Sequence, residues 1–103
     1  MSGSTPFRAE LAHPTLDPKR RRALFRAWHR GMREMDILLG HFADARIAEL
    51  NETELDDFEA LMELPDRDVF MWLSGEAETP AAYDTSVFRK LKLFHSHDRP
   101  IDL

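Results

Sequence analysis

Apolar residues recur at intervals of three and four positions over most of residues 18 to 97, which is the spacing of helices that bury one face. Alternating runs rich in Val, Ile, Thr and Tyr, which would indicate β-strands, are missing. The apolar stripes consist of Leu24 and Trp28; Met32, Met35, Leu39 and Phe42; Leu55, Phe58, Leu61 or Met62, and Leu64; Val69, Phe70, Trp72 and Leu73; and Val87, Leu91 and Phe94. The pattern predicts an all-α protein, a compact bundle of about five short helices.

Gly31 lies between the first two stripes, in the segment HRGMREMD. A glycine in a helix interior costs roughly 1 kcal/mol relative to alanine, so its presence needs a structural or binding reason. One option is that Gly31 ends the first helix in a left-handed conformation and a second helix follows at once. The other is a single long helix with bare backbone at that point. We favour the break.

The next two helices carry signals at their ends. Asn51 with Glu54 three residues later resembles a capping box and predicts a helix start. Pro65 predicts the end of that helix, because proline has no backbone N–H and restricts the residue before it. We expect Asp66 to cap a short helix that ends at Gly75.

The last helix has two alternative starting points. It begins either at Thr79, which a proline follows, or at Thr85, because the residues just before and after Thr85 form helices poorly. We expect this helix to continue to about residue 97. The chain then divides into a flexible tail over 1–17, a helical domain over 18–97 and a flexible tail over 98–103.

The composition, with 43% apolar and 32% charged residues in a chain of 103, fits one globular domain. No apolar run approaches the 18 or so residues that cross a bilayer, so membrane insertion is not expected. The lack of cysteine excludes disulfides, thiolate metal sites and cysteine nucleophiles. The net charge of −5 is unevenly distributed: residues 17–34 hold seven bases and two acids, whereas residues 49–68 hold nine acids and one base. We expect two surfaces of opposite potential, largely made of solvated helix faces.

The sequence shows no clear set of catalytic residues. The closest histidines, His95 and His97, are two residues apart and would point to different sides of a helix, so no metal site is expected. Phosphate-binding loops and nucleophile elbows are absent, and the carboxylates are expected to be solvated. The sequence therefore indicates a protein that is not an enzyme. An alternative is a small nucleic-acid-binding domain that uses the basic cluster Lys19–Arg22, although the overall charge is acidic.

A helical wheel drawn through the Gly31 segment places Arg30 and Glu34 outside the stripe that faces the core. Ile37 falls on the same outer side. Bare backbone, charge and an exposed aliphatic group together predict a patch against which another protein can dock closely. On composition alone the simpler interpretation is a plain helix cap, with Arg30 and Glu34 as an ordinary pair four residues apart.

This segment resembles that of a known family, the small succinate dehydrogenase assembly factors that promote flavinylation of the flavoprotein subunit. The family hallmark is an Arg-Gly-x-x-Glu motif, usually Arg-Gly-Met with a following Glu-Leu-Asp. It is matched here by Arg30, Gly31, Met32, Glu34 and Asp36, with Met35 in place of leucine. A second signature, Asp-x-Phe-x-Trp-Leu after an acidic helix, is matched by Asp68, Phe70, Trp72 and Leu73. The resemblance spans about residues 18–95, and it departs at His29 and at the Gly40-His41 pair.

The resemblance implies an all-helical, chaperone-like protein that binds the flavoprotein subunit of succinate dehydrogenase, and often of fumarate reductase. It would promote covalent attachment of FAD to that partner and bind no cofactor stably itself. The implied partner-binding residues are Arg30, Gly31, Met32, Glu34, Asp36, Ile37, Asp68, Phe70 and Trp72, although for Phe70 and Trp72 we favour a role in the core. The short tail before the first helix favours a bacterial cytoplasm over the mitochondrial matrix.

Overall fold

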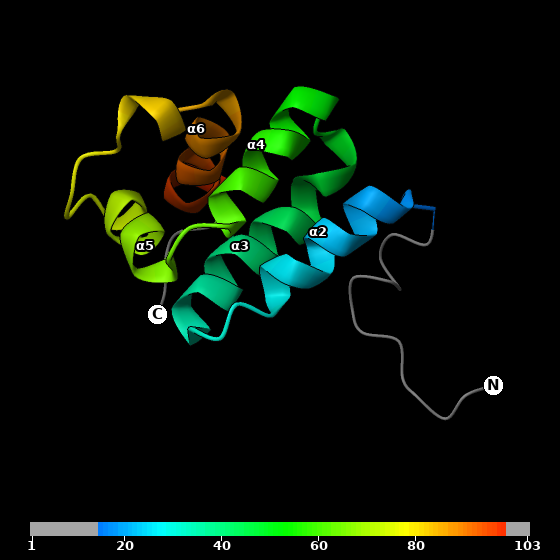
Figure 1. The fold of residues 1–103 in the computed structure, drawn as a ribbon, viewed down its shortest axis with the longest axis horizontal. Coiled ribbons are helices and arrows are strands. Elements are labelled where there is room, and N and C mark those ends of the chain that lie inside the picture. The colour runs from blue at the N-terminus through cyan, green and yellow to red at the C-terminus, as the bar shows by residue number, and fades with distance from the viewer. Residues whose placement is uncertain (1–14, 99–103) are drawn as a thin grey trace.

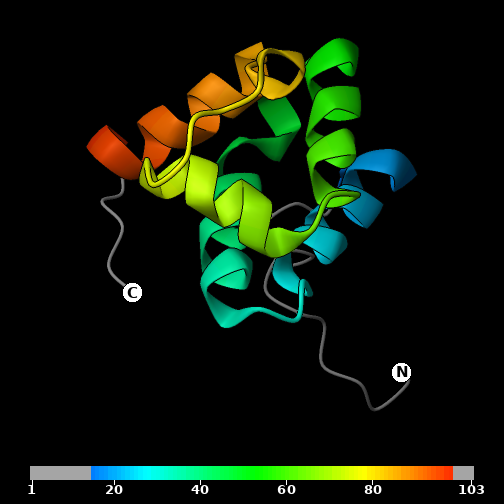
Figure 2. The same ribbon diagram turned by 60° about the vertical axis from the view of Figure 1, so that its left-hand side comes forward.

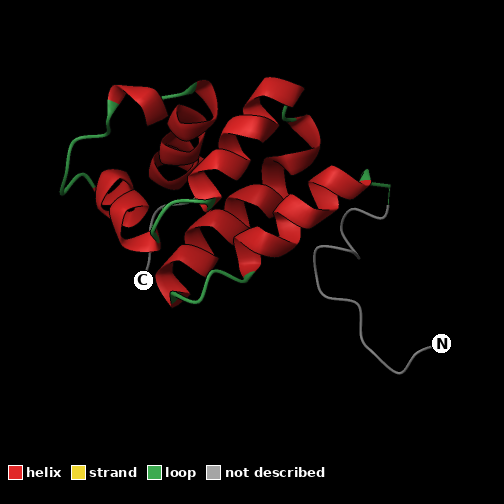
Figure 3. Ribbon diagram, in the orientation of Figure 1, coloured by secondary structure: helices red, strands yellow, loops and turns green. Residues whose placement is uncertain are grey.

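The computed structural model describes residues 15–98, and every regular element in that range is helical (Figures 1 and 3). Five α-helices form the body, which confirms the predicted all-α bundle. They are α2 (Pro18–Trp28), α3 (Arg33–Arg46), α4 (Glu52–Met62), α5 (Asp66–Ser74) and α6 (Ser86–Leu93). Short 3-10 turns occupy Ile47–Glu49 and Ala81–Tyr83, and a π-helical turn occupies Phe94–Asp98.

Helices α2 and α3 run side by side in opposite directions, and α4 packs against α2 and α6 (Figure 1). Helix α5 crosses in front of α3 and contacts it (Figure 2). Phe42 of α3 lies in the middle of the core, with its ring centroid 5.7 Å from that of Phe58 and 5.7 Å from that of Phe94. Within residues 15–98, no helix is both long enough and apolar enough to cross a membrane.

The predicted break near Gly31 is confirmed, but Gly31 is not the cap of the first helix, and the second helix does not follow at once. Helix α2 ends at Trp28 with His29 as its cap, and α3 begins only at Arg33. Gly31 therefore lies in a connection of its own, two residues beyond the α2 cap, with a φ angle of +96°. The start of α2 depends on Asp17, whose carboxylate accepts a hydrogen bond from the backbone N–H of Arg20 at 3.2 Å.

The predicted signals around α4 and α5 were largely correct. The capping box is present: the Asn51 side chain accepts from the Glu54 N–H, and the Glu54 carboxylate accepts from the Asn51 N–H. Gly75 ends α5 in the left-handed conformation, with φ +84°. Pro65, rather than Asp66, occupies the cap position of α5, so Asp66 becomes the first residue of that helix.

The last helix starts at the later of its two predicted positions. The Thr85 hydroxyl accepts from the Phe88 N–H at 3.3 Å, and α6 begins at Ser86. A start at Thr79 is wrong, because residues 81–83 form only a 3-10 turn that Asp84 ends. The Thr85 cap supplies an acceptor at the point where poor helix formers weaken the chain.

The predicted tails fall mostly outside the described residues, which exclude 1–14 and 99–103. The segment just before α2 is an exception. Leu16 is buried with the core, and its carbonyl accepts a hydrogen bond from Nε of Arg21 at 3.0 Å. The packed part of the chain therefore includes residue 16, one residue before the predicted end of the tail.

The expectation of two opposed charged surfaces is wrong, because the basic helix α2 and the acidic helix α4 pack against each other. Lys19 pairs with Asp56 and lies 3.5 Å from Glu52. Arg20 donates from its guanidinium to the carbonyls of Ile47 and Leu50, which are part of the backbone after α3. Much of the Lys19–Arg22 cluster is thus used within the fold.

Glu54 joins α4 to α6 from a nearly buried position, with 7% of its side chain exposed. Its carboxylate lies 2.7 Å from Nζ of Lys90 and accepts from the Ser86 hydroxyl at 2.9 Å. The hydrogen bond from Lys90, followed in weight by those from Asn51 and Ser86, holds the pKa of Glu54 below its ordinary value of 4.5 despite burial. The charged form is therefore favoured by folding.

We expect Glu54→Gln to lower the free energy of unfolding by about 1–2 kcal/mol at pH 7, because charged hydrogen bonds to Lys90 and Ser86 are lost. A carboxyl with a lowered folded pKa stabilises fully above its unfolded pKa, and that contribution disappears as pH falls through the folded value. The difference between wild type and variant should therefore narrow below about pH 4.5. Thermal melts from pH 7 to about pH 3.5 measure this.

Glu52→Gln is the matched control for that measurement, since Glu52 lies on the same helix with 72% of its side chain exposed. Its melting temperature should stay close to that of wild type at every pH, because exposed ion pairs contribute little. A Glu54→Gln variant whose deficit stays constant down to the lowest pH would contradict the assignment of the effect to the carboxylate charge.

Candidate docking site

The connection between α2 and α3, residues 29–32, forms an exposed corner of the bundle. At Gly31 the φ angle of +96° is one that residues with a Cβ rarely adopt, which explains the choice of glycine. A Cβ built there would meet no heavy atom within 4 Å, so the space outside Gly31 is open. Met32 is the N-cap of α3, and its carbonyl accepts from the N–H groups of Met35 and Asp36, each at 3.0 Å.

Arg30 does not lie on the outer surface, as the helical wheel predicted. Its side chain is only 12% exposed and reaches α4 and α5. Nε donates to Oδ1 of Asp66 at 3.0 Å, and Nη2 donates to the Met62 carbonyl at 2.7 Å. The wheel fails because Arg30 lies after the end of α2, where helical spacing no longer sets the direction of a side chain.

Asp36 forms a hydrogen bond with the backbone of the corner. Its Oδ1 accepts the backbone N–H of Arg30, so a side chain from the first turn of α3 holds the connection that precedes it. The predicted alternative, an Arg30–Glu34 pair four residues apart, is not formed. No ion-pair partner for the Glu34 carboxylate is found among residues 15–98, and Glu34 is half-buried.

The remaining predicted residues of α3 are partly accessible. Met32 is half-buried and packs against the edge of the core, and Ile37 is half-buried on the same helix. The open corner and the half-buried Glu34 and Ile37 thus provide backbone, charge and an aliphatic group close together in sequence. Their role in binding a partner stays a prediction.

The second signature lies on α5. Asp68 is exposed, whereas Phe70 and Trp72 are half-buried against the core. The Trp72 ring stacks on Tyr83 with centroids 5.6 Å apart and meets Phe88 edge-on at 6.5 Å. Both aromatic residues therefore contribute to packing, as the core interpretation expected, and any contact that they make with a partner stays a prediction.

The contact between Arg30 and Asp66 links the first signature to the first residue of α5, the helix that carries the second signature. Sequence analysis did not connect these residues, although Asp66 was noticed as a helix start. The only available signal was the unusual placement of an arginine directly before a glycine at a helix break. Such a signal does not identify which of the many acids the arginine will meet.

Sequence analysis also missed the role of Gly40, in the middle of α3. The Trp28 indole lies over this glycine, and a Cβ at residue 40 would come within 2.6 Å of Cε3 and 2.7 Å of Cε2. His41 meets the same indole edge-on, with centroids 5.1 Å apart. Helix α3 continues without a break through the Gly40-His41 pair, one of the two places where the family resemblance departs.

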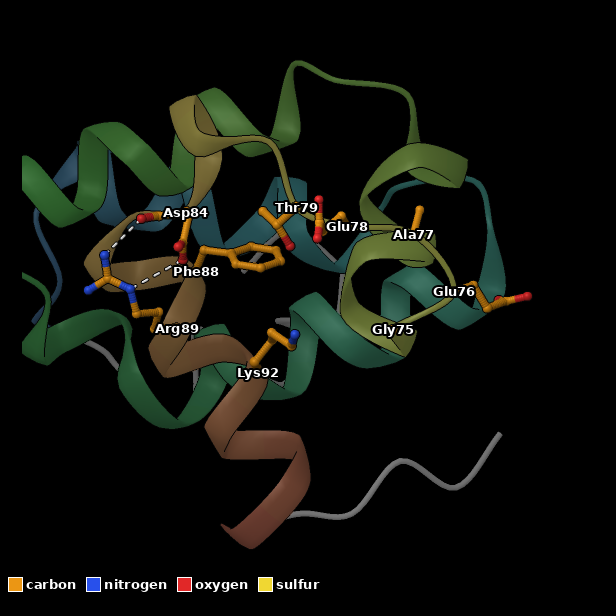
Figure 4. A pocket seen from close by; sticks show the side chains of 9 residues that line it. All are labelled: Gly75, Glu76, Ala77, Glu78, Thr79, Asp84, Phe88, Arg89 and Lys92. Atoms are coloured by element: carbon orange, nitrogen blue, oxygen red, sulfur yellow. Dashed lines mark hydrogen bonds and ion pairs between the residues drawn. The ribbon is translucent and has the colours of Figure 1, made fainter.

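A separate hollow of about 640 Å³ lies between the 75–79 loop and α6 (Figure 4). Phe88 forms part of its lining, and Arg89 at its edge donates to the side chain and carbonyl of Asp84. None of the predicted site residues lines this hollow. Among residues 15–98, no three His, Asp or Glu side chains are placed to hold a metal ion.

Comparison with known proteins explains the two signatures. The family profile described as flavinator of succinate dehydrogenase matches residues 21–95. The chain belongs to this family. Two similar relatives are the mitochondrial succinate dehydrogenase assembly factor 2 of Dictyostelium discoideum, 37% identical over 84% of this chain, and the FAD assembly factor SdhE of Acetobacter pasteurianus, 38% identical over 79%. The matched region covers 60% of the Dictyostelium protein and 74% of the Acetobacter protein.

Membership of the flavinator family confirms the resemblance and agrees with the expectation of an assembly factor rather than an enzyme. The expectation of a bacterial cytoplasm over mitochondria is wrong. Relatives from Dictyostelium, Caenorhabditis briggsae and Caenorhabditis elegans, at 36–37% identity, are named as mitochondrial. The Acetobacter relative is about equally similar, so a mitochondrial setting is not the less favoured one.

Proposed function

We propose that this protein is a chaperone-like assembly factor that binds the flavoprotein subunit of succinate dehydrogenase and promotes covalent attachment of FAD to it. Membership of the flavinator family supports the reaction class. The structural observation that carries the docking site is Gly31, an exposed glycine with open space outside it, in the first family signature. We extend the proposal to the related flavoprotein of fumarate reductase.

In this proposal the Gly31 corner is the point of closest approach, because bare backbone allows the partner's backbone to come near. Glu34 and the exposed Asp68 supply polar contacts, and Met32 and Ile37 supply apolar area. Arg30 and Asp36 shape the corner from within. Binding would hold the flavoprotein in the arrangement in which its own groups attach the flavin.

The chemistry then belongs to the partner, which holds the FAD. The hollow beside α6 does not fit a flavin dinucleotide, because Glu76, Glu78 and Asp84 line it and would repel a pyrophosphate. Of the two cations in its lining, Arg89 is already bonded to Asp84, which leaves Lys92 among three carboxylates. We therefore assign this chain no step that acts on the flavin directly.

No observation favours the nucleic-acid alternative. The cluster on which it depended, Lys19–Arg22, is used in part by contacts to Asp56, Leu16 and the carbonyls after α3. Phosphate binding requires basic groups that can replace counterions along a backbone. The pairing of α2 with α4 leaves fewer basic groups available for this purpose.

Co-expression tests the proposed function. The flavoprotein subunit is produced with and without this protein, in a host that lacks its own assembly factor. Covalent flavin fluorescence is then read from a denaturing gel, normalised to the amount of flavoprotein. We expect a strong signal only when both proteins are present. Equal fluorescence in the two lanes would contradict the proposal, and the flavoprotein of fumarate reductase can be tested in the same way.

A further inference from the structure

The side chain of Arg30 joins the corner to the turn between α4 and α5, which lies more than 30 residues later in the sequence. Its Nε and Nη2 both lie close to Oδ1 of Asp66, at 3.0 and 2.9 Å, and Nη2 also donates to the Met62 carbonyl. The Arg30 and Asp66 side chains are only 12% and 16% exposed. A pair so shielded from water is screened little by salt and depends strongly on its geometry.

Met62 and Asp66, the two residues that the Arg30 side chain contacts, both lie at helix ends. Met62 is the last residue of α4, so its carbonyl has no acceptor role within the helix and needs an external donor. Asp66 is the first residue of α5, where a negative charge is favourable for the helix dipole. Arg30 therefore links the corner at residues 29–32 to the end of α4 and to the start of α5.

The backbone N–H of Arg30 donates to Asp36, and the hydrogen bonds of His29 and Met32 hold the two ends of the corner to α2 and α3. Gly31 itself is conformationally free and has no neighbour within 4 Å of its Cβ position. Without the contact to Asp66, a connection that contains glycine would sample many conformations. The partner would then have to order this connection on binding, which costs conformational entropy, whereas a corner that is already ordered in the free protein avoids that cost.

We propose that Arg30 and Asp66 are positioning residues that hold the two signature segments, 30–36 and 68–73, as one preformed docking surface. Arg30 in this arrangement faces Asp66 and Met62 rather than the partner protein. This inference rests on the proposed function, because it concerns the same docking surface. It assigns to Asp66, which lies outside both signatures, a role in partner affinity.

The test compares Asp66→Asn with Asp66→Glu, which keeps the charge, and with Glu63→Gln as a matched control. Glu63, just after the end of α4, pairs with Arg26 of α2 at 2.6 Å, but the two side chains are 68% and 37% exposed and do not touch the corner. Two quantities are measured: the Kd for the purified flavoprotein subunit of succinate dehydrogenase, and amide hydrogen exchange of residues 29–33 in the free protein.

We expect Asp66→Asn to exchange faster at residues 29–33 and to bind the flavoprotein about tenfold more weakly, since the corner must be ordered on binding. Asp66→Glu should recover part of the affinity, and Glu63→Gln should match wild type in both measurements. If Asp66→Asn fails to fold, Arg30→Lys replaces it, because a lysine keeps the charge but lacks the fork that reaches both acceptors.

Faster exchange with an unchanged Kd would overturn the positioning role. Weaker binding with unchanged exchange would also overturn it, because Asp66 would then contact the partner directly. If the proposed function is wrong, a different result is expected: the wild-type protein itself does not bind the flavoprotein. That result would overturn both proposals before any variant is compared.

Discussion

Gly31→Arg is expected to abolish binding to the flavoprotein subunit while leaving the helical fold in place. The Cβ of an arginine at this position would meet no heavy atom within 4 Å, and the flexible side chain can extend outward from there. The cost to folding is therefore limited to backbone strain at φ +96°, about 1–2 kcal/mol. A docking partner that approaches the bare backbone closely would clash with the new side chain. Binding titrations and circular dichroism melts measure the two effects separately.

Gly75→Arg is the matched control, since Gly75 is also in the left-handed region, at φ +84°, with nothing within 4 Å of its Cβ position. It lies after the far end of α5 and outside both family signatures. The two variants should lose similar stability, but only Gly31→Arg should lose binding. Equal binding by the two would disprove the corner as the docking site, as would a Gly31→Arg variant that does not fold.

Gly40→Ala should cause the largest loss of stability among the substitutions considered. The added methyl would lie 2.6 Å from Cε3 of Trp28, so either the indole leaves its position or α2 and α3 move apart. Overpacking of this kind costs typically up to about 3 kcal/mol, and alanine returns roughly 1 kcal/mol through its helix propensity. The net loss of about 2 kcal/mol corresponds to a fall of roughly 10 °C in Tm.

A double-mutant cycle with Trp28→Phe identifies the cause. The smaller phenylalanine ring would leave more room over Gly40, so Gly40→Ala should cost much less in that background. Simple additivity of the two single losses would show that the indole is not what excludes a side chain at residue 40. The measurement is thermal or chemical unfolding of the four proteins under one set of conditions.

The starts and ends of the helices were predicted well, because capping residues act on backbone groups only a few residues away. The Asn51–Glu54 capping box, Gly75 and Thr85 each satisfy backbone groups next to them, and all three are found where the sequence indicates. The break at Gly31 was predicted for the same reason. The second signature on α5 also falls on the predicted helix.

What sequence analysis could not predict was which helix faces which. The wheel assigned Arg30 to the surface, because it assumed helical geometry across a break, whereas the side chain turns to Asp66, 36 residues later. The charge analysis likewise expected opposed surfaces, whereas Lys19 and Asp56 meet across α2 and α4. Such pairings depend on the packing of apolar faces, which any of several helix arrangements can satisfy.

Gly40 and Gly31 are nine positions apart, and the lack of a side chain makes room for a different neighbour at each position. At Gly40 the neighbour is the chain's own Trp28, whereas at Gly31 the space faces outward. In a living cell the two losses would therefore differ in kind. A defect at Gly40 lowers the abundance of the protein through quality control and is relieved by cooler growth. A defect at Gly31 also lowers stability through backbone strain, but it blocks partner binding directly, so the loss of function persists at every growth temperature.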